Sequence, residues 1–95
     1  MNVRWSKTAL VELDEIFRYI AKRNRRAASS VVRRIEALTE RLEQFPYSGR
    51  LTNETGARVV SVVRYPFVIF YAIDIPADEV VILHIRHTAQ ATALD

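Results

Sequence analysis

Cysteine is absent from the 95-residue chain, and glycine occurs only twice. Without cysteine neither a disulfide nor a thiolate metal site can form. The two histidines, His84 and His87, make a poor metal site by themselves. No apolar run reaches the roughly 18 residues that a membrane-spanning helix needs, and the opening MNVRWSK lacks a signal-peptide core. We therefore expect a soluble cytoplasmic protein with no metal, no other cofactor and no membrane contact.

What the chain does contain is typical of one globular domain over residues 1–95, since 49% of its residues are hydrophobic and 26% are charged. The formal charge is +3, and twelve of the fourteen basic residues are arginine. Arginine binds carboxylates and phosphates through two parallel hydrogen bonds, so acidic proteins and nucleic acids are the partners that this composition favours. Arginine-rich coding in a GC-rich genome is an alternative explanation for the same count.

The first half of the chain predicts a strand and a helical hairpin. Residues 2–5 suit a short strand, and Ser6 suits the N-cap of a helix over about residues 7–23. The apolar side of this helix comprises Leu10, Leu13, Ile16, Phe17 and Ile20, and the other side comprises Glu12, Glu15, Arg18 and Lys22. Asn24 suits the N-cap of a second helix, which Pro46 ends. Its apolar stripe comprises Val31, Ile35, Leu38, Leu42 and Phe45.

The second half predicts three strands, at residues 58–64, 67–73 and 79–86, after a long loop at 46–56. A short helix is possible at 89–94. The order is β-α-α-β-β-β, in which three consecutive strands form an antiparallel meander and the N-terminal strand joins one edge. The fold class is therefore α+β, with the helical hairpin packed on one face of an antiparallel sheet.

These strands are apolar on both sides, although the helices can cover only one. In residues 67–73, Val68, Phe70 and Ala72 oppose the side that carries Phe67, Ile69, Tyr71 and Ile73. Strict alternation in the last strand separates Val81, Leu83 and Ile85 from Val80, Ile82, His84 and Arg86. An apolar face of this kind predicts a partner, either a second copy or an amphipathic segment of another protein. Cover by the chain's own tail is the alternative.

The chain resembles the RelE/ParE superfamily of bacterial toxins, and the resemblance spans about residues 3–90. It is carried by residues 5–20 (WSKTALVELDEIFRYI), Ala27-Ala28, residues 42–50 (LEQFPYSGR), residues 64–71 (RYPFVIFY) and residues 80–87 (VVILHIRH). The resemblance implies the small RelE-like fold and the toxin role in a type II toxin–antitoxin pair. It also implies a cognate antitoxin partner, whose acidic, amphipathic C-terminal segment would complement the positive charge.

Two activities are known in this superfamily. RelE-like members cut mRNA on the ribosome, whereas ParE-like members inhibit DNA gyrase without known nuclease chemistry. The RelE-like pattern has an arginine in the middle strand, a basic residue after the last strand and often a C-terminal tyrosine or histidine. This chain has Val68 and Gln90 at the first two positions, and no tyrosine follows Tyr71. We therefore expect a ParE-like gyrase inhibitor that is not an enzyme. The alternatives are a ribosome-dependent ribonuclease and a non-toxic binding module or co-repressor.

Six residues are the candidates for contact with the antitoxin or the target: Arg50, Arg58, Arg64, Tyr71, His84 and Arg86. In a ribonuclease several of them would lie near His87, but alternation sends His84 and His87 to opposite faces of the sheet. Trp5 and Tyr19 are expected in the core. Residues 23–26, RNRR, are typical of a solvated turn between helices, with nucleic-acid contact as the alternative. The sequence leaves homo- or hetero-oligomer formation open.

Overall fold

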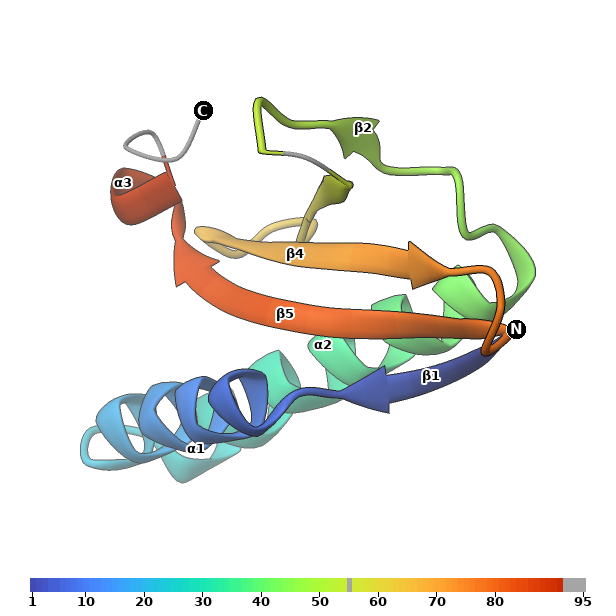
Figure 1. The fold of residues 1–95 in the computed structure, drawn as a ribbon. Coiled ribbons are helices and arrows are strands. Elements are labelled where there is room, and N and C mark those ends of the chain that lie inside the picture. Colours follow the sequence, from blue (N-terminus) through green and yellow to red (C-terminus); the bar gives the residue numbers. More distant parts are fainter. Residues whose placement is uncertain (55, 92–95) are drawn as a thin grey trace.

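The computed structural model describes residues 1–54 and 56–91 (Figure 1). In chain order the elements are β1 (Asn2–Trp5), α1 (Lys7–Ala21), α2 (Arg25–Gln44), β2 (Arg50–Leu51), β3 (Ala57–Ser61), β4 (Phe67–Asp74), β5 (Glu79–His87) and α3 (Thr88–Ala91). The short helix expected near the C-terminus thus begins one residue early, at Thr88, and the rest of its expected range, 92–94, lies outside the described residues.

The five strands form one sheet in the order β1-β5-β4-β3-β2, beneath which α1 and α2 form the second layer (Figure 1). This confirms the predicted α+β arrangement and the edge position of the first strand. The meander β3-β4-β5 is antiparallel, but β1 runs parallel to β5, with Val3 opposite Val80. The two-residue strand β2 lies inside the predicted loop and pairs with β3.

Both helices begin at the predicted capping residues. The Ala9 N–H donates to the Ser6 hydroxyl at 3.0 Å, and the Ala27 N–H donates to the Asn24 side-chain oxygen at the same distance. Each bond satisfies one of the backbone donors that the first turn of a helix leaves free. α2 ends at Gln44, just before Phe45 and Pro46, as predicted from the proline.

The buried side of α1 differs from the predicted one. Ala9 is fully buried, and Leu13, Ile16 and Ile20 pack beside it, so the inner stripe follows positions 9, 13, 16 and 20. The expectation that Leu10 lies on the buried side of the helix was wrong, because that side chain is 53% exposed. The small side chain of Ala9 lets α1 approach β5 closely, and this sets the helix rotation. The N-terminal Trp5 packs against the core as predicted.

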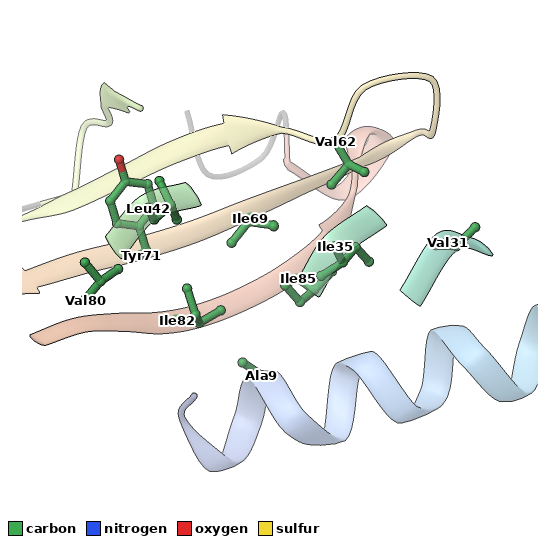
Figure 2. Close-up of a cluster of buried hydrophobic side chains, with 10 residues drawn as sticks. All are labelled: Ala9, Val31, Ile35, Leu42, Val62, Ile69, Tyr71, Val80, Ile82 and Ile85. Carbon is green, nitrogen blue, oxygen red and sulfur yellow. The ribbon is translucent and has the colours of Figure 1, made fainter. Parts of the chain in front are cut away.

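The main core lies between the helices and the sheet (Figure 2). It contains one alanine from α1, three α2 residues, Val62 and five strand residues: Ala9, Val31, Ile35, Leu42, Val62, Ile69, Tyr71, Val80, Ile82 and Ile85. Each is at most 3% exposed. Full burial of a large apolar side chain stabilises the fold by about 1.5–3 kcal/mol, so this cluster is the main source of stability.

A β-bulge in β5 interrupts the alternation expected for this strand. Phe70 pairs with His84, but the next β4 residue, Tyr71, pairs with Ile82, so Leu83 has no partner in the ladder. The extra residue reverses the side of every later position. Ile85 consequently joins Val80 and Ile82 in the helix-facing core, and the prediction that it lies opposite them was wrong.

Apolar side chains on the face of the sheet away from the helices are also buried. Val59, Val68 and Phe70 form a second cluster there, each at most 8% exposed, with Leu83 packed against it. The prediction that this face needs an external partner to cover its apolar side chains is therefore not supported. The exposed large apolar residues lie elsewhere, at Leu10, Val11, Tyr19, Phe45, Tyr47, Leu51, Val63 and Ile75.

The segment between α2 and β2 is held by the hydroxyl of Tyr71. This hydroxyl accepts from the Gly49 N–H at 2.9 Å and donates to the Pro46 carbonyl at 2.7 Å. A Cβ on Gly49 would lie 2.6 Å from the Tyr71 hydroxyl and 2.8 Å from the Val59 carbonyl oxygen. Only glycine fits here, and the close approach fixes where β2 starts.

The substitution Gly49→Ala should lower the free energy of unfolding by about 2–3 kcal/mol, because Tyr71 is fully buried and cannot move away from the added methyl group. Gly56→Ala is the matched control: a Cβ there meets open space, and only the positive φ of +76° costs about 1 kcal/mol. Chemical denaturation measures both losses. An equal or smaller loss for Gly49→Ala would contradict the close contact.

Candidate partner-binding site

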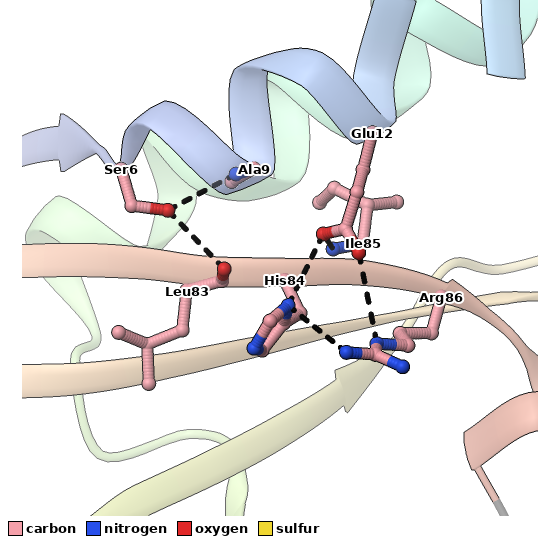
Figure 3. Close-up of polar contacts among 7 residues, drawn as sticks. All are labelled: Ser6, Ala9, Glu12, Leu83, His84, Ile85 and Arg86. Carbon is pink, nitrogen blue, oxygen red and sulfur yellow. Dashed lines mark hydrogen bonds and ion pairs between the residues drawn. The ribbon is translucent and has the colours of Figure 1, made fainter. Parts of the chain in front are cut away.

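The outer edge of β5 is covered first by β1 and then by side chains of α1. Pairing with β1 ends where Trp5 meets Ile82. The Ser6 hydroxyl then donates to the Leu83 carbonyl at 3.2 Å, and the Ile85 N–H donates to the Glu12 carboxylate at 3.0 Å (Figure 3). Two helix side chains thus replace the missing continuation of β1 and satisfy backbone groups of the strand edge.

Glu12 also anchors two polar side chains of β5. Its Oε1 lies 3.3 Å from His84 Nδ1, and its Oε2 lies 3.7 Å from Arg86 Nε. The latter separation is an ion pair beyond hydrogen-bonding distance, and the buried Nε has no hydrogen-bond partner among the described residues. The carboxylate therefore compensates the guanidinium charge without satisfying this donor.

His84 Nδ1 has two competing neighbours, because Arg86 Nη2 also lies 3.3 Å from it. When Nδ1 carries a hydrogen it can donate to Glu12, and when it is bare it can accept from Arg86. Only one of the two hydrogen bonds can exist at a time. The cluster Glu12–His84–Arg86 can consequently adopt two hydrogen-bonding arrangements on one backbone.

The two sides of the β5 end have different surfaces. A hollow of about 440 Å³ lies on the helix side, between α1 and the sheet, and is lined by Glu12, Glu15, Ile16, Tyr19, Phe67, Ile85 and His87. A smaller hollow of about 180 Å³ lies on the other side and is lined by Thr52, Glu54, Ala57, Phe70, His84 and Arg86. His84 and His87 therefore lie on opposite faces, as alternation predicted.

Tyr19 lies at the larger hollow and is 75% exposed. The expectation that it belongs to the core was wrong, because the inner stripe of α1 passes through Ile16 and Ile20 and leaves position 19 outside. An exposed tyrosine beside a hollow of mixed polar and apolar lining combines a large contact area with a polar tip, which is common in protein interfaces.

The structure brings two pairs of the six candidate contact residues together: His84 with Arg86, and Arg58 with Tyr71, which lie opposite each other in β3 and β4. Tyr71 is fully buried, so its side chain holds the chain between α2 and β2, and the prediction that it contacts a partner was wrong. Arg58 donates to the Gly49 carbonyl at 2.7 Å and lies over the Tyr47 ring at 5.0 Å, which anchors the same segment. Arg50 lies exposed in β2 and Arg64 lies exposed in the β3–β4 turn.

The residue that the sequence prediction missed is Glu12, which was expected on the outer side of its helix. Its position is three residues after Ala9 and one before Leu13, so it borders the observed inner stripe. The sequence signal was weak, because acidic residues flank this stripe at both Glu12 and Glu15 and only the first reaches the strand edge. The sheet edge that it covers is visible only in three dimensions.

The site has the chemical types that RNA cleavage uses, a carboxylate, an imidazole and a guanidinium. Its geometry is that of a structural cluster, because the Glu12 carboxylate already binds the Ile85 N–H and Tyr71 points to the other face. Within residues 1–54 and 56–91, no three His, Asp or Glu side chains come together as metal ligands. No helix in the same residues is long and apolar enough to cross a membrane.

Comparison with known proteins identifies the class. The fold matches a chain of a chromosomal ParDE toxin–antitoxin system from P. aeruginosa with a TM-score of 0.80 and 26% identity, over 92% of this chain and 95% of that one. It also matches a chain of the RelBE2 toxin–antitoxin complex from Mycobacterium tuberculosis with a TM-score of 0.64 and 24% identity, over 90% and 95% of the two chains. The second match concerns the fold alone.

The sequence comparisons are more specific. A family model described as the ParE toxin of the type II toxin–antitoxin system parDE matches residues 3–92. A candidate toxin from Sinorhizobium fredii, Y4kP, is 34% identical over 83 residues, which cover 87% of this chain and 86% of that protein. The chain therefore belongs to the ParE toxin family of type II toxin–antitoxin systems.

Removal of the Glu12 carboxylate should loosen the β5 edge. Glu12→Ala leaves the Ile85 N–H without its acceptor and Arg86 without its counter-ion, so the free energy of unfolding should fall by about 2–3 kcal/mol. Glu12→Gln should lose less, because the amide oxygen can still accept from the Ile85 N–H. Glu15→Ala, one turn along the same helix and exposed, should change stability by less than about 0.5 kcal/mol.

Urea denaturation measures these differences, and amide hydrogen exchange at Ile85 reports the edge itself. If Glu12→Ala and Glu15→Ala had equal effects on both measurements, Glu12 would have no role in closing the strand edge.

Proposed function

We propose that this ParE-family toxin acts by inhibiting DNA gyrase and is neutralised by a protein antitoxin encoded beside it. Membership in the ParE family carries the proposal. The chain has Val68 where a RelE-like ribonuclease has a middle-strand arginine. This valine is only 8% exposed within the apolar cluster on the face away from the helices, where it offers no group for RNA chemistry.

The antitoxin partner is supported by the P. aeruginosa relative, which was determined as a ParDE toxin–antitoxin system. We place the contact of this chain's antitoxin on the face that carries the smaller hollow, where His84 and Arg86 lie beside Phe70. The exposed Arg50 and Arg64 would extend that contact over β2 and the β3–β4 turn. An acidic, amphipathic segment has the charge and the apolar side chains that such a surface accommodates.

This assignment gives the two pairs of residues different roles in binding. His84 and Arg86 border the hollow and are partly buried, so a bound segment would desolvate them. Arg50 and Arg64 are exposed at the rim, where charges mainly accelerate association. An antitoxin that occupies this face need not touch α2, most of whose outer surface is charged.

Controlled expression in a bacterium tests the activity. A gyrase inhibitor should cause filamentous growth and loss of plasmid supercoiling while the mRNA stays intact, and the purified chain should inhibit supercoiling by gyrase in vitro. Co-expression of the neighbouring short reading frame should restore growth. A frameshifted copy of the gene, which makes RNA but no toxin, is the control for the cost of expression.

The alternatives predict different results. Rapid mRNA loss on translating ribosomes, with normal supercoiling, would replace gyrase inhibition with RelE-like ribonuclease activity. Normal growth with normal supercoiling and mRNA would leave a binding module without toxicity.

A further inference from the structure

The positive charge of the chain is concentrated in one segment. Residues 16–35 hold seven of the fourteen basic residues and none of the eleven acidic ones. The remainder, with seven basic and eleven acidic residues, has a formal charge of −4. Arginine-rich coding explains how many arginines a protein has, but it does not explain why acidic residues are missing from this segment alone.

Six of these cations form one surface, which we call the basic tip: Lys22, Arg23, Arg25, Arg26, Arg33 and Arg34. All six are exposed, and none forms an ion pair with a residue in the described parts of the chain. Arg18, which also belongs to the segment, is paired with Asp14 at 2.8 Å. Within residues 1–54 and 56–91 the basic tip therefore has no ion-pair partner.

The basic tip projects from the molecule. In Figure 1 the turn between α1 and α2 lies beyond the ends of β4 and β5, at one end of a molecule that measures 42 × 27 × 23 Å. The four arginines of α2 recur on its outer side, because the opposite side carries the buried Ala28, Val31 and Ile35. Arg26 and Arg33 are seven residues apart, which corresponds to about 10 Å along a helix.

The charges of α2 oppose its own dipole. The N-terminal end of a helix is partially positive and favours acidic residues. Here the first turn contains Arg25 and Arg26 and no acidic residue, whereas the acidic residues Glu36, Glu40 and Glu43 lie in the second half. Such an arrangement destabilises the helix slightly, and rules of local stability are most often broken at functional surfaces.

The side chains of the tip favour phosphate over protein. A protein interface usually has an apolar or aromatic centre, whereas Tyr19 is the one large side chain of this kind that is exposed within residues 16–35, and the other exposed positions of the tip include Asn24 and Ser29. Single-stranded nucleic acid is held mainly by several aromatic side chains on which successive bases stack, and within residues 16–35 only one large aromatic side chain, Tyr19, is exposed. Arginine, lysine, serine and asparagine are the side chains that contact the phosphates of a duplex.

From these observations we propose that the basic tip binds the phosphate backbone of duplex DNA without sequence preference. Rigid helices present the cations on a projecting surface. The cations can therefore contact phosphates of both DNA strands across a groove, while the helices stay outside the groove. This binding is separate from the proposed function, because the tip lies away from the antitoxin surface and does not depend on which target the toxin inhibits.

Fluorescence anisotropy with a labelled mixed-sequence duplex of about 20 base pairs tests the proposal, between about 50 mM and 200 mM salt. The full chain should bind with a Kd in the micromolar range at the lower salt. The triple variant R26Q/R33Q/R34Q should bind at least about tenfold more weakly, and the slope of log K against log salt should fall by about two to three, since each lost phosphate contact removes about 0.9.

The control variant R4Q/K7Q/R41Q removes the same net charge from other exposed positions. It should weaken binding by less than about threefold, because distant charges are screened. Both triple variants replace exposed side chains, so thermal melting should show that both remain folded. The single variants Arg26→Gln and Arg33→Gln provide the same comparison with smaller expected effects.

Equal losses in the two triple variants would overturn the proposal, because binding would then follow net charge alone. It would also be overturned by no binding at the lower salt, by tighter binding to an RNA duplex or to single-stranded DNA, or by full displacement with polyglutamate of equal charge.

Discussion

The structure depends on how the edge of β5 is closed. This strand has nine residues but β1 has only four, so the outer edge beyond Ile82 has no strand beside it. Beyond β1 the Ser6 hydroxyl and the Glu12 carboxylate bind this edge; Ser6 is the N-cap of α1, and Glu12 lies in the helix itself. The same contacts therefore terminate the sheet and set the position of α1 against the core. Loss of either contact would leave a backbone polar group of β5 without its partner and would weaken both layers at once.

Much of the fold could be predicted because it depends on local rules. Ser6, Asn24 and Pro46 mark the helix limits through capping and backbone restriction, and the β-branched runs mark the strands. The predictions were wrong at positions where tertiary contacts determine which side chains are buried. The bulge at Leu83 reverses the faces of β5, and the close approach of Ala9 rotates α1 so that Leu10 becomes exposed. Neither feature has a counterpart in a periodic pattern.

The site was predicted less well than the fold, for a physical reason. A surface residue is defined by exposure, and the sequence could not show that Tyr71 is buried or that Arg58 anchors a neighbouring segment. Glu12 was missed because a carboxylate at the border of an apolar stripe has the same pattern whether it meets water or a strand edge. The charge asymmetry of the hairpin was present in the sequence, but its meaning needed the protruding, unpaired geometry of the tip.

The parallel pairing of β1 with β5 has a consequence for how the toxin is made. Val3, the second residue of β1, pairs with Val80 in β5. This pairing therefore cannot form until a strand near the other end of the chain has been made. During synthesis the helical hairpin can form early from local contacts, whereas this pairing is among the most distant in sequence and closes late. A chain of which only the first half has been synthesised therefore cannot complete the sheet, because β1 has no partner until β5 has been made.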